Sequence, residues 1–98
     1  MNQDIIWTRY LECIPKNLER NLHTIPRTDL HKLVIQSMES LSGKQKIYLQ
    51  HYLAGFTQTE IAREFGVNVS SVHRGIRAAV KNVGRYLDRV IVIKIREE

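Results

Sequence analysis

The 98-residue sequence lacks the features typical of membrane proteins and of proteins from oxidising compartments. Its single cysteine, Cys13, cannot form an internal disulfide. No apolar run approaches the roughly 18 consecutive residues of a membrane span. The N-terminus also lacks the basic-then-apolar order of a secretory signal, because Asp4 precedes only a short apolar cluster at residues 5–7. We therefore predict a cytoplasmic protein with no membrane contact.

Catalytic and metal-binding patterns are missing as well. The four histidines are scattered, and no two have the i, i+4 spacing that places two ligands on one helix face. Cys13 has no cysteine partner for a zinc pattern and no neighbouring motif that would lower its thiol pKa, so we interpret it as a small apolar core residue. The sequence contains no glycine-rich phosphate loop. We predict that the chain is not an enzyme and binds no cofactor and no metal.

Acidic residues are absent from one long segment. Residues 1–41 contain five Lys/Arg and five Asp/Glu, so the net charge of +5 comes entirely from residues 42–98. Residues 66–87 contain no acid at all. A solvated helix usually interleaves both signs of charge, whereas a one-signed stripe is typical of a surface that binds phosphates. We therefore expect an anionic partner on the second half of the chain.

Apolar residues recur at helical spacing through most of the chain, and 43% hydrophobic content suits one small core. We predict an all-α fold, a small multi-helix domain with a helix-turn-helix in its C-terminal part. The single domain divides into N-terminal helices at residues 1–41, the helix-turn-helix unit at 42–87 and a tail at 88–98.

Two prolines divide the N-terminal part. The first helix is expected to end near Cys13, before Pro15, and a short second helix is expected at residues 18–25. Thr28 or Asp29 is expected to cap a third helix. A fourth helix at residues 44–53 is expected to bury Ile47, with Tyr48 or His51 nearby.

Residues 57–80 carry the clearest local pattern. Thr57 and Glu60 have the spacing of a capping box, in which each side chain satisfies a backbone N–H of the first helical turn. Gly66 follows where a left-handed residue would end this helix. Asn68 is a good N-cap for a second helix, whose apolar positions share one face and whose polar positions lie on the others. The apolar positions are Val72, Ile76, Ala79, Val80 and Val83. An ordinary helical hairpin would show the same caps, but the missing acids favour DNA binding.

Residues 41–83, LSGKQKIYLQHYLAGFTQTEIAREFGVNVSSVHRGIRAAVKNV, resemble the DNA-binding region 4 of bacterial sigma factors. The resemblance lies in T-x-x-E-I-A, in G-V-N where the family usually has G-V-S, and in S-V followed by R-x-x-x-A. It implies binding to double-stranded DNA and contact with RNA polymerase, for which the helix at residues 44–53 is the candidate. Complete sigma factors also have an upstream domain that melts the promoter. The forty residues before Leu41 are too few for it, so we expect that the chain does not open promoters alone.

Gly75 departs from the family pattern, which often has a larger residue there. A glycine inside a helix costs about 1 kcal/mol relative to alanine. Three interpretations are open: close helix packing, close approach to DNA, or a glycine that is merely tolerated.

These observations predict a sequence-specific double-stranded-DNA-binding regulator of transcription, of phage or bacterial origin. Arginine suits guanine O6 and N7, and an apolar side chain suits the thymine methyl group. The candidate base-reading residues are Val69, Ser70, Ser71, His73, Arg74 and Arg77. The candidate phosphate-binding residues are Lys44, Lys46, Thr57, Gln58, Lys81 and Arg85.

The C-terminal tail is rich in apolar and β-branched residues. It reads either as an extension of the second helix or as a strand, with Gly84 inside the helix or ending it. We favour a helix, because the chain offers no second strand as a partner. The apolar surplus predicts a homodimer contact. Its candidate residues are Tyr86, Leu87, Val90, Ile91, Ile93 and Ile95.

Two other functions remain open from the sequence. Lys44-Gln45 and Tyr52-Leu53 are similar to the first helices of phage terminase small subunits, which would make the chain a DNA-packaging accessory. Alternatively, the sigma-like surface would bind polymerase or an anti-sigma factor without any contact to DNA.

Overall fold

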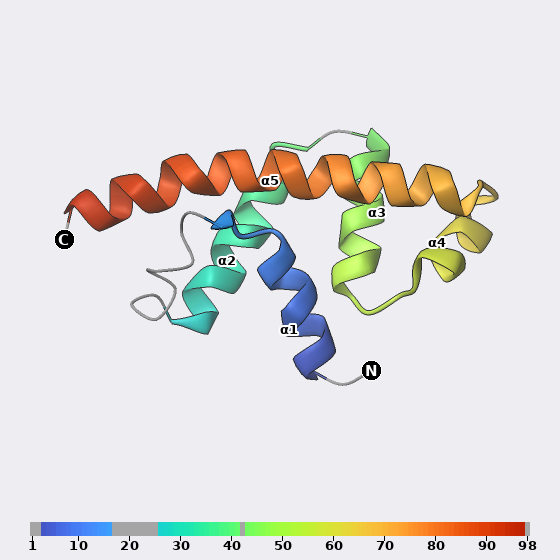
Figure 1. The fold of residues 1–98 in the computed structure, drawn as a ribbon, viewed down its shortest axis with the longest axis horizontal. Coiled ribbons are helices and arrows are strands. Elements are labelled where there is room, and N and C mark those ends of the chain that lie inside the picture. Colours follow the sequence, from blue (N-terminus) through green and yellow to red (C-terminus); the bar gives the residue numbers. More distant parts are fainter. Residues whose placement is uncertain (1–2, 17–25, 42, 98) are drawn as a thin grey trace.

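The computed structural model describes residues 3–16, 26–41 and 43–97, with side chains for residues 5–16, 26–41 and 43–90. These ranges contain five helices and no strand, which confirms the predicted all-α fold (Figure 1). In chain order, the helices are α1 (Gln3–Glu12), α2 (Arg27–Met38), α3 (Gly43–Leu53), α4 (Gln58–Phe65) and α5 (Val69–Glu97). The short helix predicted at residues 18–25 lies outside the described residues.

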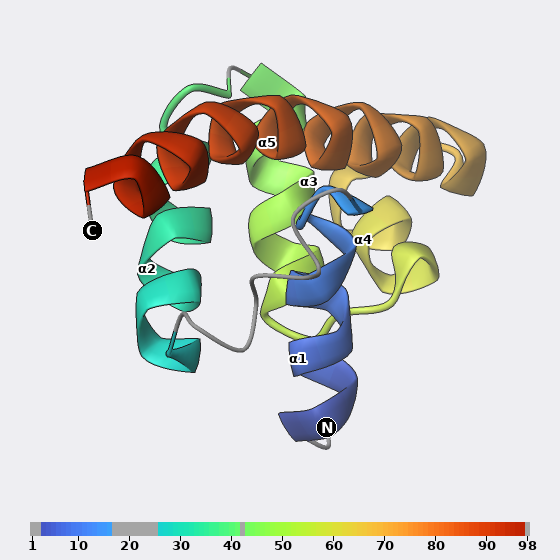
Figure 2. The ribbon, with the colours of Figure 1, turned by 60° about the vertical axis from the view of Figure 1, so that its left-hand side comes forward.

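Helix α5 organises the molecule. It has 29 residues and is therefore about 43 Å long at 1.5 Å per residue. Figures 1 and 2 show it as a single rod with the other four helices gathered on one side. One face of α5 is buried at every third or fourth residue, as an amphipathic helix requires. The buried residues of this face are Val72, Ile76, Ala79, Val83 and Leu87.

The other helices and their flanking turns complete one apolar core around this face. The segment that follows α1 adds Cys13, which is only 1% exposed, as predicted for an apolar core residue. Burial, together with the nearby charge of Glu12, raises the pKa of the Cys13 thiol to about 12. The core residues outside α5 are Tyr10, Cys13, Ile14, Leu30, Leu33, Val34, Met38, Leu41, Tyr48, Leu49, Leu53, Ile61 and Ala62.

The helix-turn-helix forms as the sequence predicts. Thr57 Oγ1 accepts a hydrogen bond from the Glu60 N–H at 3.1 Å, and Glu60 Oε1 accepts one from the Thr57 N–H at 2.9 Å. Gly66 ends α4 in the left-handed conformation, with φ of 64°. Helix α5 starts directly after Asn68, whose carbonyl accepts from the N–H groups of Ser71 and Val72. The capping box and the glycine therefore fix the turn between α4 and α5.

The rotation of α3 about its axis differs from the prediction. Ile47 was expected to be buried, but it is 39% exposed, and Tyr48 and Leu49 are buried instead. Helices α3 and α5 pack closely because Gly75 has no side chain and the Tyr48 ring lies against it. This contact turns Tyr48 inward, which places Ile47 on the outside. The helix also begins at Gly43, one residue before the predicted Lys44.

The start of α2 was predicted wrongly too. Neither Thr28 nor Asp29 caps the helix, because it begins at Arg27 with Pro26 as its N-cap. Pro26 has φ of −59°, and its carbonyl accepts hydrogen bonds from the N–H groups of Asp29 and Leu30. The proline ring fixes this φ before folding, so the helix begins at the proline without a side-chain cap.

The C-terminal tail continues α5 as far as Glu97, which confirms the helix and excludes the strand. Gly84 lies within this helix. Leu87, however, was predicted to contact a second copy and is fully buried in the core of its own chain. Val90 also packs against that core. Part of the apolar surface of the tail is therefore buried within its own chain, because α2 packs against the C-terminal half of α5 (Figures 1 and 2).

Candidate nucleic-acid interface

The predicted base-reading residues lie on the surface of the first part of α5. Val69 is 43% exposed, and Ser70, His73, Arg74 and Arg77 are exposed as well. Ser71 is half-buried. The opposite face of the same turns is in the core, so these side chains point outward together. The structure thus presents hydrogen-bond donors and an apolar Val69 side chain at the start of the second helix.

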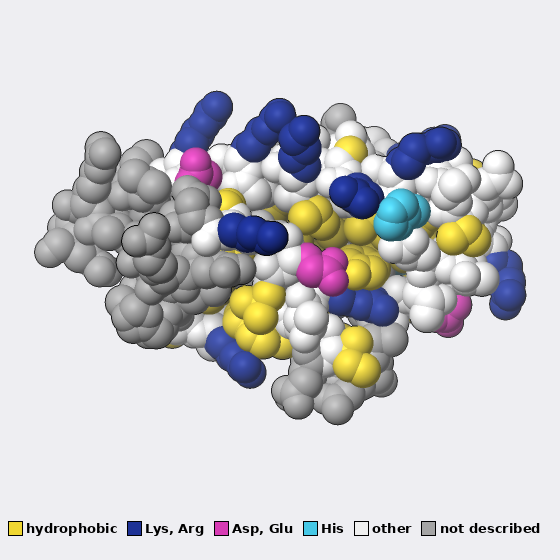
Figure 3. All heavy atoms as spheres, in the orientation of Figure 1, with side chains coloured by type: hydrophobic (Ala, Val, Ile, Leu, Met, Phe, Trp, Pro, Cys, Tyr) yellow, Lys and Arg dark blue, Asp and Glu magenta, His cyan; other side chains and the backbone are white. Residues whose placement is uncertain are grey.

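Two of the predicted phosphate-binding residues share a groove with two of the base-reading residues. Gln58, at the start of α4, lines it together with His73, Arg77 and Lys81 of α5. Gln58 Oε1 lies 3.2 Å from His73 Nδ1, which links the two helices of the motif. The volume of the groove is about 700 Å³. In Figure 3, dark-blue Lys and Arg side chains follow α5, and yellow apolar atoms lie in the hollow beneath it.

The remaining phosphate candidates are more dispersed. Arg85 lines a neighbouring hollow that it shares with Lys81 and Lys16. Lys46 forms a salt bridge with Glu39, with 3.0 Å between Nζ and Oε2. Lys44 is exposed at the start of α3 and lines neither the groove nor the hollow. Thr57 uses its hydroxyl oxygen in the capping box of α4.

The groove contains an acid that the sequence did not point to. Glu12, at the end of α1, lines it opposite Arg77 and Lys81. The Tyr52 hydroxyl donates to the Glu12 carboxylate, at 2.9 Å from Oε2 and 3.1 Å from Oε1. Burial and this hydrogen bond raise the pKa of Tyr52 to about 12, so the hydroxyl stays protonated. Forty positions separate the two residues in the chain, so no local pattern could reveal the contact.

Arg9 attaches α1 to the end of α3. Its Nη1 donates to the carbonyl oxygens of Tyr52 at 2.7 Å and Phe56 at 2.9 Å. The guanidinium carbon also lies 4.3 Å from the centre of the Tyr52 ring. The last carbonyls of a helix have no partner within the helix, and a cation placed there also suits the helix dipole. Arg9 therefore fixes where α1 lies relative to the groove.

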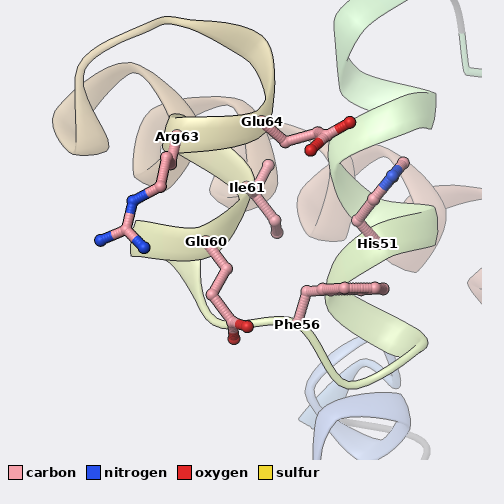
Figure 4. A pocket seen from close by; sticks show the side chains of 6 residues that line it. All are labelled: His51, Phe56, Glu60, Ile61, Arg63 and Glu64. Carbon is pink, nitrogen blue, oxygen red and sulfur yellow. The ribbon is translucent and has the colours of Figure 1, made fainter.

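A second hollow, of about 450 Å³, opens between α3 and α4 (Figure 4). His51 and Phe56 form one wall, with ring centroids 5.6 Å apart. Glu60 and Glu64 border it from α4, and Ile61 lies between them, whereas Arg63 points away from the rings. Its acidic border distinguishes this hollow from the basic surface of α5.

The family of the chain follows from residues 31–83. A family model described as sigma-70, region 4 matches this segment, which is more than half of the chain. The chain belongs to the sigma-70 region 4 family. Its region 4 unit runs from α2 through α3 and α4 into α5, and it starts at residue 31 rather than at the Leu41 where the sequence resemblance began. No curated protein and no solved structure was found to match the chain.

Region 4 is a helix-turn-helix unit, which indicates binding to DNA or to RNA polymerase. Helix α1 and the far half of α5 lie outside the matched segment and pack onto it. No helix in the part of the chain described here is long and apolar enough to cross a membrane. Among those same residues, no group of three or more His, Cys, Asp or Glu side chains is placed to hold a metal ion.

Proposed function

We propose that this region 4 protein is a sequence-specific double-stranded-DNA-binding regulator of transcription that reads the major groove with the first part of α5. The observation that supports the proposal is the exposed face of residues 69–77, which carries donors and cations but no acid. Arg74 and Arg77 have the geometry for a bidentate contact to guanine, and Val69 suits a thymine methyl group. Ser70, Ser71 and His73 complete the reading face.

The DNA backbone is proposed to lie against the start of α4 and the middle of α5. Gln58 and Lys81 share one groove there, and Arg85 continues the line along α5. Lys46 is expected to contribute less, because Glu39 already occupies its ammonium group.

Salt dependence of duplex binding tests this arrangement. The logarithm of the affinity should fall linearly with the logarithm of the salt concentration, by about 0.9 per phosphate neutralised. Lys81→Ala should weaken binding to every sequence alike and reduce the slope by about one phosphate. Lys32→Ala, on an exposed position of α2, is the matched control and should leave the slope unchanged. Binding that does not change with salt would contradict the proposal.

Contact with RNA polymerase is a second proposed function, supported by the face that α3 and α4 share. Ile47, Phe56 and Phe65 are 39%, 46% and 38% exposed, and His51 lies between the two phenylalanine rings. Exposed apolar side chains grouped in this way are typical of a protein interface. Glu64 beside them, near the end of α4, would repel DNA, so we assign this face to a protein partner.

Purified RNA polymerase provides the test. Phe56→Ser should lose binding to polymerase and keep binding to DNA, whereas Lys81→Ala should show the reverse. In a separate co-purification from cells, a large ATPase in place of polymerase would favour the DNA-packaging accessory instead.

Self-association through the tail is also proposed, with fewer residues than the sequence suggested. Tyr86 is 39% exposed and remains available, and the backbone of Ile91, Ile93 and Ile95 continues the same helix. Light scattering should find a dimer that Tyr86→Glu dissociates. Removing the tail after Arg85 is unsuitable as a test, because it would also remove the buried Leu87. A full-length monomer at tens of micromolar would contradict this proposal.

A further inference from the structure

We infer that Glu12 is an affinity-setting residue, which weakens the binding of DNA phosphates in the groove between α4 and α5. The inference rests on the proposed DNA-binding function and concerns a residue outside the matched region 4 segment. Glu12 lines the same groove as Gln58, Arg77 and Lys81. It therefore brings a negative charge to the side of the molecule where the polyanion is proposed to lie.

The position of this carboxylate is set by the fold. The Tyr52 hydroxyl donates to both of its oxygens, and Tyr52 belongs to α3, inside the region 4 unit. Arg9, one helical turn before Glu12, donates to the Tyr52 carbonyl in the last turn of α3 and to the Phe56 carbonyl in the segment after it. These contacts come from two different side chains of α1 and hold it in one place. Glu12 is exposed, and the Tyr52 hydroxyl holds its carboxylate at the groove.

Its charge is not neutralised by a direct ion pair. Among the described residues, no Lys or Arg is found in a salt bridge with Glu12. The guanidinium of Arg9 is directed at backbone carbonyls and at the face of the Tyr52 ring. A phosphate that approaches Lys81 therefore meets a carboxylate that is not held in a direct ion pair.

Glu12 is placed to act on the backbone of DNA and not on its bases. Glu12 and Lys81 both line the groove and the neighbouring hollow, whereas Arg77 and His73 line the groove alone. Lys81 lies about three helical turns beyond the start of α5. A recognition helix reads base edges chiefly with its N-terminal residues. The contribution of Glu12 should therefore be the same for every sequence. It lowers affinity for DNA in general and leaves the sequence preference to α5.

Glu12→Gln is the test, because the amide oxygen can still accept from Tyr52 while the charge is removed. Binding of full-length proteins to the preferred duplex and to a random duplex is measured at low and at moderate salt. The variant should bind both duplexes about three- to tenfold more tightly at low salt, as expected for one repulsive charge near a protein surface. The gain should shrink as salt rises, because screening weakens the repulsion. Glu12→Lys, which reverses the charge, should give a larger gain.

Glu64→Gln is the matched control, since it removes one exposed acid that lines the other hollow. It changes the net charge equally and should alter affinity much less. A Glu12→Gln variant that binds like the wild type, or gains no more than Glu64→Gln, would overturn the inference while the proposed function stands. A change confined to one base position would overturn it as well, because Glu12 would then read sequence. If neither the wild type nor any variant binds duplex DNA, both the proposed function and this inference are wrong.

Discussion

Gly75 lies against the ring of Tyr48, so closely that a Cβ atom on residue 75 would be 2.7 Å from Cδ2 of the tyrosine. The ring belongs to α3 and is only 4% exposed. Of the three interpretations that the sequence left open for Gly75, the structure supports close packing of helices. The contact sets the distance between α3 and α5, and therefore the placement of the recognition helix.

Gly75→Ala should destabilise the protein. Inserting a methyl group into a packed contact costs about 1 to 3 kcal/mol, and alanine recovers about 1 kcal/mol of helix propensity. We expect a net loss of about 1 kcal/mol, and at most about 2 kcal/mol, in the free energy of unfolding, measured by chemical denaturation.

Gly84→Ala is the matched control in the same helix. A Cβ there would lie 3.6 Å from the Cys13 carbonyl oxygen and 3.7 Å from Pro15 Cγ, which are ordinary contact distances. The substitution should be neutral or stabilise by up to about 1 kcal/mol. Equal losses at both glycines would show that the Tyr48 contact has no special role.

Arg9→Met should loosen the attachment of α1. Methionine keeps an apolar stem but removes the hydrogen bonds to the carbonyls of Tyr52 and Phe56. A hydrogen bond from a charged donor contributes about 1.5 to 3 kcal/mol, and partial exposure reduces this, so we expect a loss of about 1 to 2 kcal/mol.

Arg27→Met serves as the comparison for Arg9→Met. Arg27 lies 4.7 Å above the Trp7 ring at an exposed position, where such a contact is worth about 1 kcal/mol or less. Thermal unfolding of both variants measures the difference. If Arg9→Met lowered the unfolding temperature less than Arg27→Met, Arg9 would not be the residue that attaches α1.

The capping box gives the protein a predictable response to acid. The hydrogen bonds from the backbone and side chain of Thr57 lower the pKa of Glu60 below its ordinary value of 4.5. A carboxylate with a lowered pKa in the folded state stabilises the protein above its unfolded pKa, and this contribution is lost as the pH falls through the folded value. Wild type should therefore be more stable than Glu60→Gln at neutral pH. The difference should shrink as the pH falls below 4.5 and vanish below the lowered folded-state pKa of Glu60. Denaturation curves of both proteins at several pH values provide the measurement. A stability difference that persists in acid would contradict this expectation.

The parts of the fold predicted correctly depend on residues close together in the chain. The capping box of Thr57 and Glu60 and the left-handed Gly66 lie within ten residues, and each acts through its own backbone. The outward face of α5 could likewise be predicted from the sequence. Amphipathic spacing places Val72 and Arg74 on different faces of the helix, whatever structure surrounds it.

The errors and omissions arise from contacts between distant segments. Ile47 is exposed because Tyr48 turns toward Gly75 on another helix. Leu87 is buried because other helices cover the far half of α5, which no local pattern reports. Glu12 reaches the groove only because α1 packs beside α3. Helical periodicity identifies which faces are apolar, but it cannot say which partner covers each one.

The central claim is that the first part of α5 reads duplex DNA. The most direct test is selection of bound sequences from random duplexes by the wild type, followed by binding of Arg74→Ala to the selected site. Arg89→Ala, an exposed arginine of α5 beyond the matched segment, is the control. The wild type should enrich one defined site, and Arg74→Ala should bind it about 1 to 3 kcal/mol more weakly and lose preference at one base pair. A folded Arg74→Ala variant with full affinity and full preference, or a wild type that enriches no site, would contradict the claim.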